Sequence, residues 1–575
     1  MPGFFVSSIP CGISLRNRYP DRCIEDSLAV EGYSVKRHTL SKFLRDKAFC
    51  DSDSFSFVTE GIILNLTSLL SEYNVTDIND LIIEMYHKEG EAFFKNFIGT
   101  FSGAFFDKGK SLWLIWTNHV GDKSVFYSVE KGLVAGSQVN YIIDSLRVQG
   151  ASLSFDEQAA YQMLTFGFME GEDTYAKEIK RLRGGQYIRY QNNVLEIKEY
   201  FKIQKDISRF AGKTEEEVID LFDEVFRKAS QMEYAKDDEY GYRYLADLSG
   251  GLDARMNMWV AHSINKKHIQ FITYSKANYL DEIIAKQLAA YWNDEILIKP
   301  LDDISFLYDV DEIVFLNAGL SLYSGITGGK RLLEQLNLQN YGLEHTGQLN
   351  GGIIGSYLTA IGGGKEPTGM YSERLKHRLR KTNRNDYSDH ELYMLYTRGF
   401  RGVMNTQMIR SNYTEAYTTT CHPDVVSFCF DIPVEWRINH SFYKKWIMRK
   451  YPEAATFKWE KIDARITDSK SSLVIKKLMI RAPRKMIRMI RRQKYVNTGM
   501  NPLDYWLHTH NEVRDYLDAY EKDGYSYLPS ETSAQLIDDM KELYRTGSAS
   551  EKTMVLTVLA SAKLYFGENY ASFIG

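Results

Sequence analysis

The chain has 575 residues, which is enough for two or three domains of ordinary size. Apolar residues make up 44% of it and charged residues 25%, a globular composition that excludes a disordered, collagen-like or fibrous chain. Its 71 Lys and Arg against 75 Asp and Glu give a net charge of −4, which excludes a protein that binds nucleic acid through its overall charge. We therefore expect no nucleic-acid partner.

Cysteine usage and hydropathy predict a cytoplasmic location. The five cysteines are odd in number and irregularly spaced, which indicates reduced thiols and neither a disulfide framework nor a zinc site. The first residues lack the basic segment and long apolar run of a signal peptide. No window approaches the roughly 18 to 20 apolar residues that a transmembrane helix needs.

Residues 1–205 are predicted to form a layered α+β domain. Short apolar stretches separated by Gly, Asp and Asn are typical of strands joined by turns, and Asn192-Asn193 suits a hairpin. The expected strands or apolar runs are 55–58, 61–64, 100–106, 111–117, 124–128, 132–135, 185–190 and 194–197, and the expected helices are 66–73 and 77–88.

Residues 206–575 are predicted to form a second domain, which follows a polar linker at 203–213. An amphipathic helix at 214–232 carries three glutamates in its first turn, where the helix dipole favours anions. The following segments alternate between strand and helix patterns, which predicts a parallel sheet covered on both faces. Beyond about residue 330 the pattern is almost entirely helical. The alternating segments are strand 242–248, helix 253–264, strand 269–274 and helix 281–292.

The strand at 242–248 runs through Ser249-Gly250-Gly251 directly into a helix that begins near Asp253. Ligands of open parallel sheets bind at the carboxyl ends of strands, and a helix N-terminus offers free N–H groups to phosphate. The two glycines let the backbone approach an anion, and Ser249 adds a hydroxyl donor. Asp253 would repel phosphate unless a divalent cation bridges them, which implies Mg²⁺. The alternative is a structural glycine-rich turn.

The segment Ser249–Asp253, SGGLD, resembles the pyrophosphatase (PP) loop of the class B asparagine synthetase superfamily, which includes β-lactam synthetases and lasso-peptide cyclases. Four other segments, in the same order, strengthen the resemblance. GTFSGAFFD and the sequence up to Leu146 are similar to its glutaminase-type domain, TYSKANYLDEIIAKQLA to its second nucleotide strand and helix, and TGQLNGGIIGSY to its second metal loop. CHPDVVSFCFDIPVEWRINHSFYKKWIMR resembles its C-terminal helical region.

The resemblance implies an N-terminal nucleophile (Ntn) hydrolase-like sandwich joined to an α/β adenine-nucleotide domain with a helical C-terminal part. It implies an ATP-dependent, AMP-forming amide ligase that adenylates a small-molecule or peptide carboxylate. Its cofactors would be ATP and Mg²⁺, with Asp253 as the metal ligand and Lys461 as the residue that stabilises the transition state. Family members are often homodimers. The nucleotide-binding residues implied are Leu248, Ser249, Gly250, Gly251, Asp253, Thr273, Tyr274, Ser275 and Gly347.

The glutaminase motifs of that family are broken in this chain. The family uses an N-terminal cysteine nucleophile, where this sequence has Pro2 and Gly3. Its Asn-Gly-Glu motif falls on Glu60-Gly61-Ile62, so the amide donor and the carboxylate that clamps glutamine are both replaced. A buried substrate amine left without its carboxylate is costly. We therefore expect an inactive glutaminase domain and an amine that does not come from glutamine.

The second metal loop also departs from the family, because two positions that are usually acidic fall on Gln348 and Gly351, with Asn350 between them. Magnesium often takes only one or two carboxylates together with phosphate oxygens and waters, so this loss need not abolish binding. The alternative is a catalytically impaired nucleotide-binding protein or scaffold. Ammonia-dependent asparagine formation is a third hypothesis.

A basic segment at 469–496 holds ten Lys and Arg and no acidic residue, interleaved with apolar side chains. A basic amphipathic helix can lie at an anionic membrane surface, which predicts peripheral membrane contact. The alternative is a helix docked on the protein with a solvated basic face.

Overall fold

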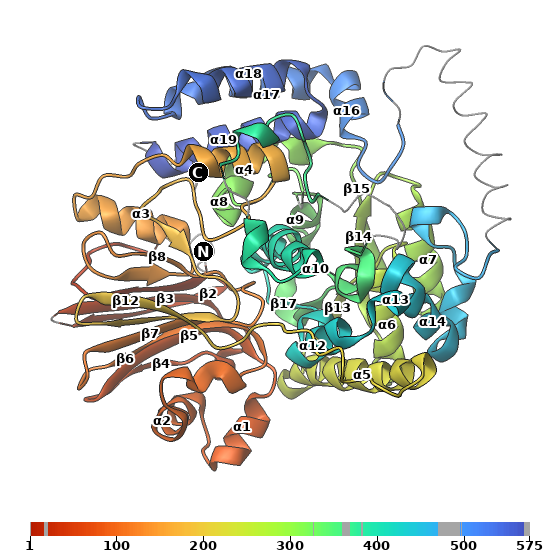
Figure 1. Ribbon diagram of the computed structural model, residues 1–575, viewed down its shortest axis with the longest axis horizontal. Coiled ribbons are helices and arrows are strands. Elements are labelled where there is room, and N and C mark those ends of the chain that lie inside the picture. Colours follow the sequence, from red (N-terminus) through yellow and green to blue (C-terminus); the bar gives the residue numbers. More distant parts are fainter. Residues whose placement is uncertain are drawn as a thin grey trace.

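The computed structural model describes residues 2–15, 21–30, 32–325, 327–358, 368–380, 383–469, 495 and 497–567. Figure 1 shows two layered antiparallel sheets on the left, a parallel sheet with its helices on the right, and the C-terminal helices along the top. Apart from Ser469 and Tyr495, the basic segment 469–496 lies outside the described residues, so membrane contact there stays a prediction. Among the described helices, none combines the length and the apolar character needed to cross a bilayer.

Two six-stranded antiparallel sheets face each other in the N-terminal half. Their inner faces share one apolar core, in which Phe4 and Val6 of one sheet pack with Val58 and Ile115 of the other. The first sheet has the order β10 (Lys180–Arg181), β8 (Phe126–Ser128), β9 (Val134–Gly136), β1 (Gly3–Ser7), β3 (Tyr33–Leu40) and β2 (Cys23–Val30). The second has the order β12 (Val194–Glu199), β11 (Gln186–Gln191), β7 (Leu112–Thr117), β6 (Gly99–Asp107), β5 (Phe55–Ile63) and β4 (Phe49–Asp51).

Helices cover the two outer faces and complete four layers. α1 (Leu66–Tyr73) and α2 (Ile78–Glu89) share a core with Phe57 and Phe105 of the second sheet. α3 (Val139–Val148) and α4 (Glu157–Phe166) share one with Phe5 and Phe126 of the first sheet. The predicted α+β sandwich is confirmed, and Asn192 and Asn193 have φ of 52° and 61°, as a tight hairpin requires.

The second half contains a five-stranded parallel sheet. Its order is β15 (Ile296–Pro300), β14 (Gln270–Ser275), β13 (Arg243–Asp247), β16 (Tyr341–His345) and β17 (Ala416–Tyr417). The chain starts in the middle at β13, goes outward to β15 and then returns to the other side of β13 at β16. This reversal of strand order is a topological switch point, where open α/β sheets bind ligands.

Helices cover both faces of this sheet. On one face, Ala246 and Phe271 share a core with Val260 of α6 (Leu252–Ser263) and Leu288 of α7 (Leu280–Trp292), and α5 (Glu215–Tyr240) adds to it. The other face packs on α8 (Val310–Asn317), α9 (Thr327–Leu333) and α11 (Gln407–Arg410). The remaining described helices are α10 (His390–Met394), α12 (Pro423–Asp431), α13 (Val434–Arg437), α14 (Ser441–Lys450), α16 (Leu503–Thr509), α17 (Asn511–Gly524), α18 (Ala534–Thr546) and α19 (Ala549–Phe566).

The prediction of an almost entirely helical chain beyond residue 330 is wrong at β16 and β17. Strand β16 has the sequence YGLEH, in which Glu344 and His345 interrupt the apolar pattern expected of a buried strand. All five residues are nevertheless buried. Glu344 is paired with Arg410, and His345 lies between two carboxylates, so burial leaves neither charge alone. Tertiary ion pairs, rather than local pattern, make this segment a strand.

The two halves of the chain are interlocked. One apolar core contains Ile142 and Leu164 of the N-terminal half together with Val314 of α8 and Leu559 of α19. Lys42, in the loop after β3, donates hydrogen bonds to the carbonyl oxygens of Leu338, just before β16, and Gly342, within β16, at 3.1 and 2.8 Å. The N-terminal half therefore contacts the parallel-sheet half through a shared apolar core and through the hydrogen bonds of Lys42.

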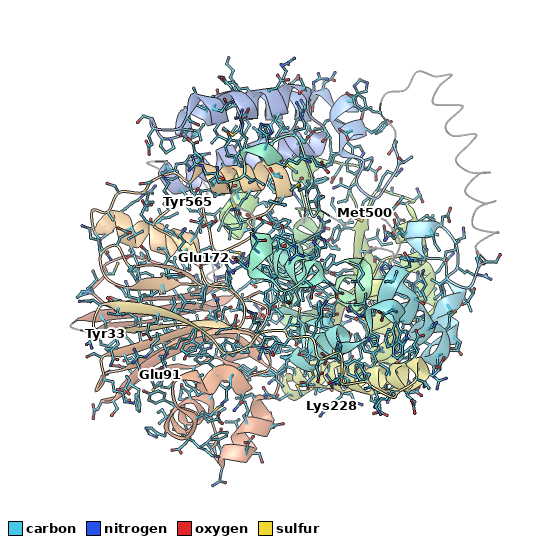
Figure 2. The ribbon with its side chains drawn as sticks, in the orientation of Figure 1. Tyr33, Glu91, Glu172, Lys228, Met500 and Tyr565 are labelled. Atoms are coloured by element: carbon cyan, nitrogen blue, oxygen red, sulfur yellow. The ribbon has the colours of Figure 1, made fainter. Side chains whose placement is uncertain are left out.

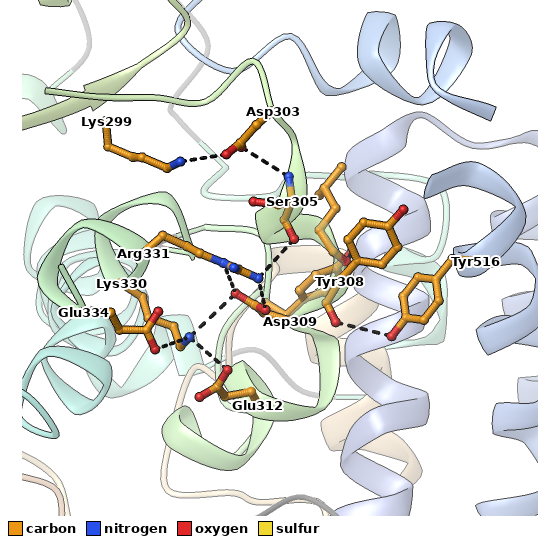
Figure 3. Close-up of polar contacts among 12 residues, drawn as sticks. Lys299, Asp303, Ser305, Tyr308, Asp309, Glu312, Lys330, Arg331, Glu334 and Tyr516 are labelled. Atoms are coloured by element: carbon orange, nitrogen blue, oxygen red, sulfur yellow. Dashed lines mark hydrogen bonds and ion pairs between the residues drawn. The ribbon is translucent and has the colours of Figure 1, made fainter. Parts of the chain in front are cut away.

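A cluster of charged side chains joins α8 to α9, as Figure 3 shows. Lys330 is 2% exposed, and its Nζ lies 2.7 Å from Glu334, 2.9 Å from Glu312 and 3.7 Å from Asp309. Arg331 adds a two-pronged pair with the Asp309 carboxylate. We call these five residues the Lys330 cluster. Since its charges are paired among themselves, we assign it a structural role.

Candidate functional site

The turn between β13 and α6 is anchored by hydrogen bonds on both sides. The N–H of Gly250 donates to Asp281 Oδ1 at 3.0 Å, and its carbonyl oxygen accepts from Arg255 Nη2 at 2.9 Å. The N–H of Gly251 donates to Ser249 Oγ at 3.2 Å. Gly251 is the N-cap of α6, and no side chain caps this end of the helix. The local sequence therefore builds a fixed glycine turn at an uncapped helix N-terminus.

A cavity of about 260 Å³ opens at this turn, at the carboxyl ends of β13 and β14 and beside the loop after β16. The structure brings most of the predicted nucleotide-binding residues together there. Gly250 and Gly251 form the turn behind the lining, while Ser275 is fully buried and donates its hydroxyl to the Lys276 carbonyl oxygen instead. The predicted residues that line the cavity are Leu248, Ser249, Asp253, Thr273, Tyr274 and Gly347.

Glycine at 347 lets the loop after β16 lie directly against α6. A Cβ at this position would be 2.3 Å from the backbone nitrogen and Cα of Ala254, closer than any real contact. Asn350 donates to the carbonyl oxygen of Asp253 at 3.1 Å and fixes the same approach. The glycine turn and the loop after β16, far apart in the sequence, are thus adjacent at the switch point.

The Asp253 carboxylate lies where the glycine turn and the loop after β16 approach each other. Burial raises its pKa to about 6, although the N–H of Gly351 and the positive charge of Lys461 both favour its ionised form. Asp281, which also lines the cavity, has its pKa raised to about 6 by burial and by the charge of Glu460. Two carboxylates with pKa values above the usual range therefore border one cavity, an arrangement that is enriched at functional sites.

The loop after β16, which the sequence resemblance predicted to be a metal loop with two acidic positions replaced, carries two side-chain amides. Gln348 Oε1 and Asn350 Oδ1 are buried and have no hydrogen-bond partner among the described residues. Gln348 donates its amide to Thr406 Oγ1, and Asn350 donates to Asn257 Oδ1, each at 2.6 Å. Those bonds leave the two oxygens as free acceptors. Carboxylate and amide oxygens are ligand types that Mg²⁺ takes.

Lys461 lies outside the lining of the cavity. It is exposed in a 3₁₀ turn, Glu460–Ile462, and its Nζ is 5.7 Å from the centre of the Trp459 ring. The turn itself contacts the glycine loop, since the N–H of Glu460 donates to the Gly250 carbonyl oxygen at 3.2 Å. Lys461 is therefore near enough to act electrostatically on Asp253, and its catalytic role stays a prediction.

Sequence reasoning missed four polar or flexible residues of the lining. Asp247 and Arg410 form an ion pair of 3.0 Å there, although they are far apart in the chain. Met500, labelled in Figure 2, contributes from the segment before α16. Asp281, another lining residue, is the first residue of the helix predicted at 281–292, whereas no sequence pattern indicated Arg410. The fourth residue, Gln348, was noted in the sequence only as a position that is usually acidic in the related family.

The positions of the broken glutaminase motif lie in β5. Glu60 is 2% exposed, accepts a hydrogen bond from the Thr39 hydroxyl at 3.0 Å, and has its pKa raised by burial. Gly61 has φ of 99°, and a Cβ there would be 2.0 Å from the Thr100 carbonyl oxygen. The glycine of the motif thus keeps a backbone role, while its two functional side chains differ.

Residues 50–201 match a family model described as a glutamine amidotransferase domain. This part of the chain is similar to glutamine amidotransferase domains of the Ntn type. The match confirms the expected glutaminase-type domain in the N-terminal half. No curated protein matches the chain.

Two solved structures resemble this chain weakly. The glutamine phosphoribosylpyrophosphate amidotransferase from B. subtilis, complexed with ADP and GMP, has 8% identity and a TM-score of 0.23. A structure of the allosteric regulatory enzyme of purine biosynthesis has 9% identity and a TM-score of 0.22. Each alignment covers 47% of this chain and 59% or 58% of the other, so this chain matches little more than half of their length. Likenesses this weak support no inference about function.

Proposed function

We propose that this protein is an ATP-dependent, AMP-forming ligase that adenylates a carboxylate and transfers the acyl group to an amine from a source other than glutamine. The observation that carries the proposal is the cavity at the β13–β16 switch point, with the Ser249–Asp253 turn on its wall. Parallel sheets bind nucleotides at such points. The boundary at residues 205 and 206 between a glutaminase-type and a synthetase domain belongs to the same proposal.

In the proposed reaction, a carboxylate oxygen attacks the α-phosphorus of ATP and pyrophosphate leaves. The amine then attacks the acyl carbon, and AMP leaves with the bonding electrons. The uncapped N-terminus of α6 would face the β- and γ-phosphates, and the Ser249 hydroxyl would turn from Gly251 to donate to a phosphate oxygen. Leu248, Thr273 and Tyr274 would border the adenosine.

The residues present fit one Mg²⁺ ion. Asp253 would supply the carboxylate, and the partner-free amide oxygens of Gln348 and Asn350 would replace the carboxylates of the related family. Bound there, the ion would neutralise charge on the phosphates. Among the described residues there is no cluster of three His, Cys, Asp or Glu for a metal, so phosphate oxygens and waters would complete the set.

An amine other than one released from glutamine is supported by the β5 residues. Glu60 stands where the related family has its amide donor, and Ile62, fully buried, stands where it has the carboxylate that binds the glutamine amine. An apolar side chain cannot pair a buried ammonium group. The glutaminase-type domain would then serve as a scaffold for the synthetase half.

ATP–pyrophosphate exchange across a panel of carboxylates tests the proposal with the full chain and Mg²⁺. We expect at least one carboxylate to support exchange, and Asp253→Ala to lower the rate at least 100-fold, since the variant loses the carboxylate of the site. Asp424→Ala is the matched control, because Asp424 also lies in the first turn of a helix but is 73% exposed. Undiminished AMP formation by Asp253→Ala would refute the assignment.

A nucleotide-binding scaffold is the second candidate. The exposed position of Lys461, away from the cavity lining, favours it. The two candidates differ in pyrophosphate release: a scaffold binds ATP in calorimetry but releases no pyrophosphate with any carboxylate or amine.

A further inference from the structure

The wall of the cavity formed by Asp247 and Arg410 contains an acceptor that nothing else in the described protein uses. Asp247 is the last residue of β13, and its Oδ2 accepts from Arg410 Nη2 at 3.0 Å. Its Oδ1 is buried and has no partner among the described residues. A buried carboxylate oxygen without a donor is costly unless a ligand supplies one.

Arg410 holds this carboxylate in a fixed orientation. The guanidinium is 3% exposed, pairs through Nη1 with Glu344 of β16, and also hydrogen-bonds the Tyr274 hydroxyl. Since Arg410 contacts residues of β13, β14 and β16, it cannot turn without breaking contacts to all three strands. Asp247 Oδ1 is therefore a preorganised acceptor, with Arg410 as its positioning residue.

Charge and neighbours indicate which part of a ligand this acceptor meets. Two carboxylates, Asp247 and Glu344, share the single cation Arg410, so this wall has no spare positive charge for a phosphate. Asp247 directly precedes Leu248, and with Ile272 and Tyr274 the nearby lining is largely apolar or aromatic. A neutral group that carries an O–H or N–H donor beside a flat apolar face fits this environment.

We infer that Asp247 accepts a hydrogen bond from the nucleoside part of the bound nucleotide and makes the site selective for it. The inference rests on the proposed function, because it places the nucleoside in this cavity. The donor is either a ribose hydroxyl or the exocyclic amino group of adenine, and both present the same chemistry to Oδ1. The proposed contact involves neither the Ser249–Asp253 turn nor the loop after β16.

The test measures binding of four nucleotides to the full chain by calorimetry with Mg²⁺: ATP, 2′-deoxyATP, 3′-deoxyATP and ITP. The first two analogues each lack one hydroxyl, and ITP lacks the amino group. We expect the wild-type protein to bind one of them about tenfold more weakly than ATP, and Asp247→Ala to bind that analogue and ATP equally within about twofold. The analogue that loses affinity identifies the donor.

Asp247→Ala leaves Arg410 paired with Glu344, so no unbalanced charge is created by the substitution. Asp247→Asn, which keeps one oxygen and the shape, should retain part of the discrimination, and Asp515→Ala, at a side chain 70% exposed, should retain all of it. Equal affinity of the wild-type protein for all four nucleotides, or unchanged discrimination in Asp247→Ala, would overturn the inference while leaving the ligase proposal intact. Absence of any ATP binding by the wild-type protein would overturn both.

Discussion

At the residue scale, a fully buried imidazole lies directly before the second loop of the cavity. His345 Nδ1 is 2.6 Å from Glu233 and Nε2 is 2.9 Å from Asp237, both on α5, and its ring stacks on Tyr234 at 3.8 Å. Burial lowers its pKa, but Asp237 and Glu233 raise it overall to about 9. His345 is therefore a charged structural group, and its position beside the loop does not make it a metal ligand.

We expect a pH-dependent contribution of His345 to stability. Its pKa in the folded protein, about 9, exceeds the ordinary value of 6.5, so the contribution is complete below pH 6.5 and is lost as pH rises through 9. The difference corresponds to about 3 kcal/mol. The wild-type protein should melt well above His345→Gln at pH 6.5, and the gap should shrink by pH 9.5.

The comparison with the variant also has to account for an opposing contribution from Lys42. Burial lowers the pKa of Lys42 to about 7, so its effect on stability increases with pH between 7 and the ordinary lysine range. Lys42 is present in both the wild-type protein and His345→Gln, but it shares Asp237 with His345, so the gap is compared between Lys42→Met backgrounds as well. A gap in melting temperature that is constant from pH 6.5 to 9.5 would mean that His345 is neutral in the folded protein.

At the element scale, the Lys330 cluster holds α9 against α8. Burial lowers the pKa of Lys330, but hydrogen bonds to Glu312 and Glu334 and the charge of Asp309 raise it overall. Lys330→Met keeps the length of the side chain and leaves Glu312 and Glu334 without their cation. We expect a loss of about 3–5 kcal/mol, the usual result of breaking a buried pair, seen as a lower melting temperature.

Lys376→Met is the matched control for this prediction. Lys376 also pairs with a glutamate, Glu373, but the two side chains are 53% and 60% exposed. Exposed pairs contribute about 0–1 kcal/mol, so the control should melt within about 1 °C of the wild-type protein. Equal effects of the two substitutions would show that burial does not strengthen the Lys330 cluster.

The elements that sequence reasoning found are those with a local signal. Helix α1 and the Asn192-Asn193 hairpin follow from apolar spacing and turn residues, and the Ser249–Asp253 turn follows from its glycines between a strand and a helix. Strand β16 and the Asp247–Arg410 pair were missed for one reason: their polar side chains are satisfied by residues distant in the chain. A single sequence does not show which distant residues pair. It does show glycine turns, and the cavity residues next to the Ser249–Asp253 turn were predicted from that local signal.

At the scale of the whole molecule, Glu415 joins the N-terminal sandwich to the parallel sheet. It lies immediately before β17 and is 1% exposed, with Lys47 at 3.1 Å and Lys123 at 2.6 Å from its carboxylate oxygens. Its backbone carbonyl oxygen accepts from the N–H of Glu344 at 2.9 Å, so the same residue pairs with β16. Burial raises its pKa, but Lys123 and Lys47 lower it overall to about 2.

This arrangement predicts that Glu415→Gln weakens the attachment of the two halves. Lys47 and Lys123 would stay buried beside a neutral amide, which costs several kcal/mol when one partner of a buried pair is removed. The pKa of Glu415 in the folded protein lies below the ordinary glutamate value. Its contribution to stability should therefore be complete at pH 7 and should be lost only as the pH falls toward 2. Calorimetric melting at pH 7 should show a transition at a lower temperature than in the wild-type protein, and proteases should cut sooner between 203 and 213.

Glu542→Gln, at a glutamate 53% exposed, is the control and should change neither the melting temperature nor the rate of cleavage. If Glu415→Gln melts and is cut like the wild-type protein, the sandwich is held to the sheet by its apolar core alone.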